Sequence, residues 1–430
     1  MSQKRELQSP AMVSPLIGRT LDSRHDRRAV IRRAMTLGLA APMVAAMLQI
    51  QGESSAAQDA SPVAAPSGDP IKIGSPYNLT GGYASIDNPA ANGSRLAVKE
   101  LNEAGGVLGR PVEIIIEDGR SDVPTITSVA KKLVEEDGVH VLVGLTDTSY
   151  MLAAGPVAQE AGLPFLDVGG TAPLITTVGD FIFMLPFGDN VQAAVAAEYA
   201  NEQGWKTAAI LVDEAMDYTK FLAQYFKDRF TMEDIGGEIV SELSYSMGDT
   251  DFSGQLTEFV NLDPKPDFLF ISANPGEIGT IVRQARDLGL DLPIVGGDGY
   301  DTPLLAELGG DAATNIYFTT HQGIYDQTPI SEAFNAAYEA EYGNPPEAVF
   351  AALGYDGIKL MADAIERAGS IDGTAVRDAL AATQGFEGVT GTISYEPGSR
   401  IPSKSVALIE VVDGQNTLLE IVVPEVVPEA

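Results

Sequence analysis

Apolar residues from Ile71 onward fall into short continuous runs that alternate with segments of helical spacing. Continuous apolar runs are typical of strands buried on both faces, and apolar residues three and four apart are typical of amphipathic helices. The predicted strands are Ile71–Gly74, Val112–Ile116, Val139–Val143, Phe165–Val168, Phe181–Leu185, Thr207–Val212, Gly237–Leu243, Phe268–Ile271 and Leu292–Val295. The predicted helices are Asn88–Ala104, Val123–Glu136, Met151–Glu160, Val191–Gln203, Lys220–Phe230, Phe252–Asn261 and Ile278–Gly289.

The last hundred residues have a different order of elements. Two predicted helices, Pro329–Tyr342 and Phe350–Ala368, follow each other with little between them. Three predicted strands come after them: Thr392–Tyr395, Ser405–Val412 and Leu418–Val423. Strands alternating with helices predict parallel sheets covered on both faces, here in two successive runs. The sequence therefore predicts an α/β fold of two doubly wound lobes, with a tail that returns to the first lobe and crosses again.

The first 57 residues have the features of an export signal. They contain 8 of the 27 basic residues and only 4 of the 60 acidic ones, with an apolar stretch at 34–50 and a small-x-small site at Ser55-Ala56-Ala57. This is the arrangement of a signal peptide. The pair Arg27-Arg28 resembles a twin-arginine (Tat) signal; a Sec signal with incidental arginines, or an uncleaved signal, is the alternative. Residues 58–70, rich in Ala, Pro, Ser and Asp, are predicted to be a disordered linker.

Charge and cysteine content exclude several functions. Beyond residue 57 the chain has an excess of 37 negative charges, which argues against a nucleic-acid partner because phosphate binding requires a basic face. The chain has no cysteine, so disulfides, thiolate metal sites and a lipoprotein anchor are excluded. Only three histidines are present. We therefore expect no metal site and no cofactor.

Several motifs in sequence order resemble one family. They are Gly93–Pro111 with the following Val112–Asp118, Val143-Gly144, Gly170–Pro173, Gly248–Ser253 and Arg283–Leu290. Together they are similar to the substrate-binding proteins of ABC importers for branched-chain amino acids, which have a type I periplasmic binding fold. The resemblance covers about residues 71–424. Each motif is weak alone, and the set behind an export signal is specific.

The resemblance implies two lobes joined by three crossover segments, with a ligand in the cleft between them. By analogy, lobe one comprises 71–188 plus 321–396, lobe two comprises 189–320 plus 397–424, and 425–430 is a tail. Ligand binding closes the lobes by a hinge motion, as in a Venus flytrap, and the closed form docks on the permease. The fold agrees with this, because ligands of open parallel sheets bind at the carboxyl ends of the strands.

On lobe one, the resemblance implies that small hydroxyl residues bind the ligand α-carboxylate. Thr148 occupies that position, with Ser149 beside it. The next loop contributes Gly169, Gly170 and Thr171, where the family uses a backbone group and a threonine. Hydroxyls and N–H groups at a helix start suit a carboxylate. The alternatives are a helix N-cap for Thr148 or Ser149 and a tight turn for the glycine loop.

On lobe two, the resemblance assigns the ligand ammonium to Asp298, which otherwise is a turn residue beside glycine. Tyr218 lies near a family tyrosine, although the spacing is one residue longer. Asn274 replaces an aromatic residue of the leucine-binding members, and Ile86 replaces a tyrosine. These departures leave the side-chain pocket undefined, and Tyr77, Tyr83 or Tyr150 could supply aromatic walls instead.

The family's disulfide in lobe one is absent here. Its two ends correspond to Arg120/Ser121 and Asp147, so an ion pair between Arg120 and Asp147 in its place is a hypothesis.

The sequence thus predicts an exported, extracytoplasmic receptor of an ABC importer, and not an enzyme. Its partners would be a small-molecule ligand (an amino acid or a related carboxylate or amide) and the permease subunits, and the protein would be a monomer. Amino acids, amides, urea and aromatic acids all remain open as ligands. The first alternative is a solute-sensing subunit of a signalling system. A less favoured one is an α/β enzyme, since no nucleophile stands beside a base.

Overall fold

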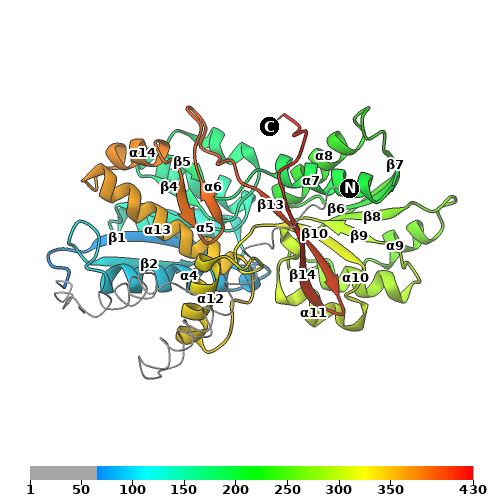
Figure 1. The fold of residues 1–430 in the computed structure, drawn as a ribbon, viewed down its shortest axis with the longest axis horizontal. Helices are drawn as coiled ribbons and strands as arrows, with labels where there is room; N and C mark the ends of the chain where they lie inside the picture. Colours follow the sequence, from blue (N-terminus) through cyan, green and yellow to red (C-terminus); the bar gives the residue numbers. More distant parts are fainter. Residues whose placement is uncertain (1–64, 430) are drawn as a thin grey trace, which may run out of the picture. The chain divides into compact units, whose positions relative to one another are not determined.

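The computed structural model describes residues 65–429, which form one compact unit (Figure 1). The predicted signal peptide and most of the predicted linker lie outside the described residues. The end of that linker is tied to the body: the Ser67 N–H donates to the Gly109 carbonyl at 2.9 Å, and Arg110 Nε donates to the Asp69 carbonyl at 2.8 Å. Within residues 65–429, no helix combines the length and hydropathy that a membrane span requires.

Lobe one is built on a five-stranded parallel sheet with the order β2-β1-β3-β4-β5. The helices α4 and α13 pack against each other on one face, and α5 and α6 pack together on the other. The elements are β1 (Ile71–Tyr77), α4 (Ala84–Glu103), β2 (Val112–Asp118), α5 (Val123–Glu135), β3 (Val141–Gly144), α6 (Thr148–Ala161), β4 (Phe165–Asp167), β5 (Ile182–Met184), α12 (Pro329–Tyr342), α13 (Phe350–Ala368), α14 (Gly373–Ala381) and the hairpin β11 (Phe386–Gly388)–β12 (Gly391–Ile393).

Two glycines allow α4 and α13 to cross at very short range. A Cβ atom on Gly93 would lie 1.8 Å from the Ala351 carbonyl oxygen, and one on Gly354 would lie 2.0 Å from the Ala90 carbonyl oxygen. Because such distances are far inside van der Waals contact, no larger residue fits at either position without moving a helix. This contact fixes a late helix of the chain to the first helix of lobe one.

Lobe two is built on a seven-stranded sheet with the order β14-β13-β10-β9-β8-β6-β7. Five strands are parallel, while β13 pairs antiparallel with both β10 and β14. The elements are α7 (Asp189–Glu202), β6 (Thr207–Asp213), α8 (Asp217–Phe230), β7 (Glu238–Tyr245), α9 (Ser253–Val260), β8 (Phe268–Ser272), α10 (Ile278–Asp287), β9 (Ile294–Gly296), α11 (Pro303–Gly309), β10 (Ile316–Thr320), β13 (Val406–Val412) and β14 (Gln415–Val422).

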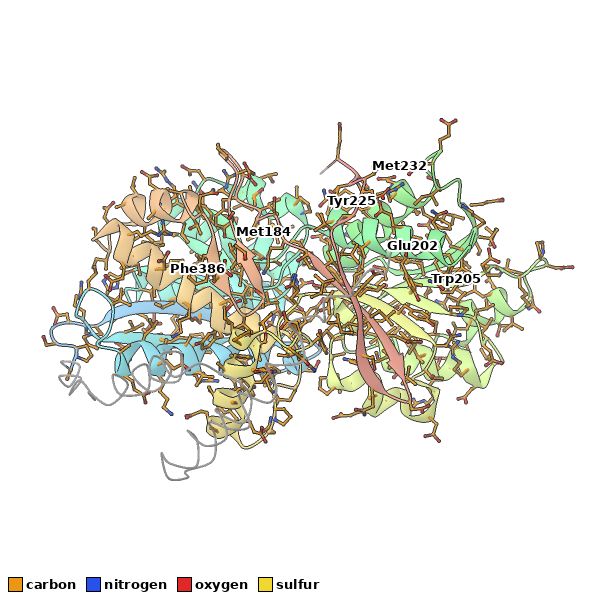
Figure 2. All side chains as sticks on the ribbon, viewed as in Figure 1. Met184, Glu202, Trp205, Tyr225, Met232 and Phe386 are labelled. Carbon is orange, nitrogen blue, oxygen red and sulfur yellow. The ribbon has the colours of Figure 1, made fainter. Side chains whose placement is uncertain are left out.

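An apolar core covers each face of the lobe-two sheet. Trp205, labelled in Figure 2, lies at the start of β6 and belongs to the core under α7 and α8. Its ring stacks on Phe268 with the centroids 5.3 Å apart and meets Tyr199 edge-on at 5.9 Å.

The chain passes between the two sheets three times, through residues 185–188, 321–328 and 394–405. The predicted α/β fold of two parallel-sheet lobes joined by three crossover segments is therefore confirmed. The predicted strands and helices are all present, with ends that differ by a few residues. Two α-helices and two strands of the described residues were not predicted: α11, α14, β10 and β11.

Candidate ligand site

The carboxyl ends of β3 and β4 in lobe one face those of β6, β8 and β9 in lobe two around a buried pocket. This is where open parallel sheets bind their ligands. The side chains leave a cavity volume of about 10 Å³ in this pocket, which is space for about one water molecule. It is lined by Tyr83, Ile86, Thr146, Asp147, Thr148, Gly169, Gly170, Thr171, Tyr218, Pro275, Asp298, Gly299 and Phe350.

Six of the eight residues proposed from the sequence line this pocket: Thr148, Gly169, Gly170, Thr171, Tyr218 and Asp298. The other two lie beside it and connect the lobes instead. The Asp217 N–H donates to Ser149 Oγ at 2.9 Å. The Asn274 side chain contacts Tyr83 and Asp213.

On the lobe-one side, the polar groups sit at the start of α6. Asp147 is the N-cap, and its Oδ1 accepts hydrogen bonds from the backbone N–H groups of Ser149 and Tyr150. Neither Thr148 nor Ser149 is therefore the cap. The turn before them is strained, since Leu145 has a φ of 61°, a left-handed conformation that is unfavourable for leucine. Thr148 is fully buried, and its Oγ1 accepts from the Ala172 N–H at 3.2 Å.

The loop after β4 adds an unpartnered hydroxyl. Thr171 is 1% exposed, and its Oγ1 makes no hydrogen bond of normal geometry among the described residues, although it lies near the buried Asp189 carboxyl, whose Oδ2 is also unpartnered. A buried hydroxyl without a partner costs free energy, so its presence at a pocket indicates a missing ligand. The glycines before it are needed for packing: a Cβ on Gly169 would lie 2.9 Å from Thr146 Cα, and one on Gly170 would lie 2.8 Å from Ile175 Cδ1.

The lobe-two side presents a buried carboxylate. Asp298 is 2% exposed, and its Oδ1 accepts from Gln192 Nε2 at 3.0 Å. Its Oδ2 lies 3.6 Å from Nε2 of His321. Burial lowers the pKa of His321 despite the neighbouring carboxylate, so the imidazole is neutral at pH 7 and does not neutralise Asp298. A ligand ammonium would supply the missing positive charge.

The remaining walls are aromatic or apolar. The Tyr218 hydroxyl accepts from the Gly299 N–H at 2.9 Å. Of the three tyrosines considered from the sequence, only Tyr83 lines the pocket; Tyr150 packs edge-on against it at 5.3 Å. Tyr77 is bonded to Ser94 inside lobe one.

Sequence reasoning missed Thr146, Pro275, Gly299 and Phe350. Gly299 could have been found, because it follows Asp298. Phe350 could not, since it begins a helix about 200 residues away along the chain from the loops that it faces.

The hypothesis of an Arg120–Asp147 ion pair is wrong. Among the described residues, Asp147 contacts the Tyr83 hydroxyl and accepts from two backbone N–H groups, and no salt bridge includes Arg120. The Asp147 carboxylate faces the start of its own helix, where N–H groups satisfy it.

Buried carboxyl groups dominate the electrostatics around the pocket. Burial raises the pKa of Asp147 to about 6 and that of Asp87 to about 7, and it raises the pKa values of Asp167 and Asp189 well above the usual range. None of the lining residues is basic. The pocket can therefore bind a positively charged group, with hydroxyls and a helix start to receive a carboxylate beside it.

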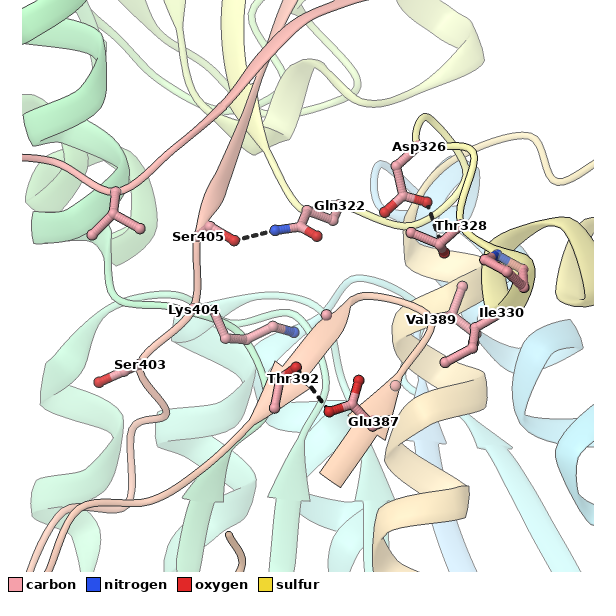
Figure 3. A pocket seen from close by; sticks show the side chains of 14 residues that line it. Gln322, Asp326, Thr328, Ile330, Glu387, Val389, Thr392, Ser403, Lys404 and Ser405 are labelled. Atoms are coloured by element: carbon pink, nitrogen blue, oxygen red, sulfur yellow. Dashed lines mark hydrogen bonds between the residues drawn. The ribbon is translucent and has the colours of Figure 1, made fainter. Parts of the chain in front are cut away.

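A second hollow lies at the lobe crossings, away from these residues (Figure 3). It is lined mainly by residues of the crossovers 321–328 and 394–405 and of the β11–β12 hairpin, including Gln322, Ser405 and Glu387. Lys404 points into this region and donates to Thr390 Oγ1 at 2.7 Å; burial lowers its pKa to about 8. Gln322 and Ser405, on two different crossovers, are hydrogen-bonded to each other. The hollow thus belongs to the hinge and holds none of the proposed ligand residues.

Comparison with known proteins agrees with this geometry. Residues 70–416 match the model of a periplasmic binding protein family. The Leu-, Ile-, Val-, Thr- and Ala-binding protein of Pseudomonas aeruginosa is 29% identical over 330 residues, which cover 76% of this chain and 86% of that protein.

Solved structures give the same result. The branched-chain amino acid transporter substrate-binding protein LivJ of Streptococcus pneumoniae, in complex with isoleucine, has a TM-score of 0.78 at 32% identity, covering 83% of this chain and all of the other. A solute-binding protein of an ABC transporter from Rhodopseudomonas palustris BisB5, in complex with 3,4-dihydroxybenzoic acid, has a TM-score of 0.75 at 28% identity, covering 84% and 99%. These relatives are solute-binding proteins and not enzymes. The chain belongs to the periplasmic binding protein family, among the ABC-transporter substrate-binding proteins of the branched-chain amino-acid type.

Proposed function

We propose that this protein captures an amino acid, or a similar small ligand with an ammonium group, in the cleft and delivers it to the membrane permease of an ABC importer. One observation carries the proposal. The unpartnered Thr171 hydroxyl and the Asp298 carboxylate, which has no cationic partner, face one buried pocket from opposite lobes. A zwitterion supplies both missing partners, because its carboxylate accepts from hydroxyls and its ammonium donates to an acid.

The roles follow from this division. Thr148 and Thr171 would hold the ligand carboxylate near the start of α6, while the N–H groups of Gly169 and Gly170 are directed to Asp167. Asp298 and the Tyr218 hydroxyl would hold the ammonium. Isoleucine in the Streptococcus pneumoniae complex and the named amino acids of the Pseudomonas aeruginosa protein support an amino acid. The bound 3,4-dihydroxybenzoic acid of the Rhodopseudomonas palustris protein represents the competing class.

Transport requires that the lobes open and close. We infer that lobe one comprises 71–188 plus 321–396 and lobe two 189–320 plus 397–424, since the crossings at 185–188, 321–328 and 394–405 include these bounds. Closure around the ligand would create the surface that the permease recognises. Export by the N-terminal signal would place the protein outside the cytoplasm, which is where its family acts.

A thermal-shift screen of the purified chain, denatured and refolded to remove bound ligand, tests this function. The panel holds aliphatic, polar and aromatic amino acids, amides, urea and benzoates. A ligand at about 100 times its Kd stabilises the folded state by about 2.7 kcal/mol. We expect a shift with an amino acid. A shift with benzoates alone would overturn the assignment of an ammonium ligand.

A further inference from the structure

One hydroxyl group connects the two lobes at the edge of the ligand pocket. The Tyr83 oxygen lies 2.9 Å from Oδ2 of Asp147 in lobe one and 2.5 Å from Oδ1 of Asn274 in lobe two. All three side chains are at most 2% exposed, so water does not replace either contact. We call these three residues the lobe bridge.

The orientation of the Asn274 amide is set by its other neighbour. Its Nδ2 donates to Oδ2 of Asp213 at 2.6 Å. The Asp213 carboxylate also accepts from the N–H groups of Ala215 and Met247, each at 2.8 Å. An ionised Asp213 only accepts, so the amide turns its NH₂ group to Asp213 and its carbonyl oxygen to Tyr83, although burial raises the pKa of Asp213.

Counting hydrogens then determines the state of Asp147. A tyrosine hydroxyl has one hydrogen, and the Asn274 carbonyl oxygen can only accept. The Tyr83 hydrogen is therefore directed to Asn274 at the shorter distance. The contact with Asp147 is a hydrogen bond only if the carboxyl group itself carries a proton and donates it to the Tyr83 oxygen. The same carboxyl group keeps Oδ1 as the acceptor that caps α6.

We propose that Asp147 is protonated in the closed cleft, so that closing of the two lobes around a ligand takes up one proton. This inference rests on the proposed function, because the closed cleft is the ligand-bound form. In an open form Tyr83 leaves Asn274, and its hydrogen becomes available to an ionised Asp147. Closure therefore converts Asp147 from an acceptor of the Tyr83 hydrogen into a donor.

The charges around the lobe bridge favour the protonated form. Asp217 of α8, Asp87 of α4, Asp167 of β4 and Asp189 of α7 all interact unfavourably with an ionised Asp147. Tyr150 of α6 is also close, while Glu277, before α10, and Asp213 of β6 face the Tyr83–Asn274 end. The basic side chain of Lys220 does not offset these charges, because it forms a salt bridge with Asp217, with Nζ 2.7 Å from Oδ1.

Ligand affinity should fall as the pH rises, because closure of the lobes takes up a proton. Burial raises the pKa of Asp147 to about 6 in this closed form, against about 4 for an exposed aspartate. A proton taken up on closure stabilises the closed form at low pH, and the gain is lost as the pH rises through the higher pKa. We expect ligand affinity to fall about tenfold between pH 5 and pH 7.5.

The test uses leucine as the probe, because it does not titrate in this range. Calorimetric titration of the purified chain in two buffers of different ionisation enthalpy gives both affinity and protons taken up. Wild type should take up close to one proton per leucine near pH 5 and almost none at pH 7.5.

Asp147→Asn keeps the capping oxygen and donates an amide hydrogen to Tyr83, so it should bind leucine without proton uptake and without pH dependence. Asp122→Asn, which changes the N-cap of α5 in the same lobe, should retain the wild-type pH dependence.

A ligand-free measurement separates this inference from the proposed function. Without ligand the cleft is open and Asp147 is ionised, so the difference in melting temperature between Asp147→Asn and wild type should stay constant from pH 5 to pH 7.5. A difference that changes with pH in the ligand-free protein would overturn the inference, because the protonation would then belong to the fold and not to closure. Leucine binding with equal affinity at both pH values would overturn the inference while leaving the receptor function intact. A failure to bind any amino acid would overturn the proposed function and this inference with it.

Discussion

The two walls of the cleft differ in the polar groups that they present. Lobe one offers neutral donors, namely the hydroxyls of Thr148 and Thr171 at a helix start. Lobe two offers the Asp298 carboxylate, positioned by Gln192 and left without a cationic partner. A ligand with opposite charges at its two ends is oriented by this difference, because each end is favoured on only one wall.

The largest expected effect tests the charged wall. Asp298→Asn keeps the shape of the side chain and removes the charge that faces the ligand ammonium. We expect the affinity for an amino-acid ligand to fall about 100-fold, corresponding to about 3 kcal/mol for a buried charge pair. Isothermal titration measures this loss. Asp311→Asn changes an exposed acid of the same lobe; it is the control and should bind normally. An affinity loss of less than fivefold for Asp298→Asn would show that Asp298 does not contact the ligand.

A smaller effect is expected on the neutral wall. Thr171→Ala removes the unpartnered hydroxyl, and the ligand carboxylate loses one hydrogen bond, worth about 1.5 kcal/mol or roughly tenfold in affinity. Thr171→Ser retains the hydroxyl and should restore most of the binding. If both variants bind alike, the hydroxyl does not contact the ligand, and the loss reflects the methyl group.

The smallest effect concerns a contact between the walls. Ser149→Ala removes the hydroxyl that accepts from the Asp217 N–H of lobe two. This bond forms when the cleft closes and touches no ligand, so the affinity should fall only two- to fivefold, or about 0.5–1 kcal/mol. Ser128→Ala, whose hydroxyl bonds only within α5, provides the baseline. A loss comparable to that of Thr171→Ala would place Ser149 in the ligand site instead.

Most of the fold could be predicted because the strands of parallel sheets are continuously apolar. The elements that escaped prediction are short and obtain their stability from tertiary contacts. The strand β10 contains four polar or aromatic residues among its five, and all but Tyr317 are buried by the sheet around it. The helix α14 buries only Val376 and Leu380. Such segments have too few apolar residues for a local pattern.

The residues of the candidate site could likewise be predicted only where a local sequence pattern marks them. Loops that follow a strand, such as the one containing Thr171, could be located from the sequence, because strand ends mark the cleft of this fold. Asp147 was taken as the partner of a nearby arginine in place of a lost disulfide. Its actual partners are its own helix start and Tyr83, whose hydroxyl also contacts Asn274, 191 residues further along the chain. No local pattern encodes that distant contact.

The position of Trp205 decides which optical signal can report on this protein. It is the single tryptophan of the chain, and it lies before the first residue of β6, at the end of the sheet opposite the cleft. Its emission depends on its stacking with Phe268 and its contact with the tilted ring of Tyr317, which a hinge motion of whole lobes leaves unchanged. Intrinsic tryptophan fluorescence will therefore follow the unfolding of lobe two and stay silent when a ligand enters the cleft.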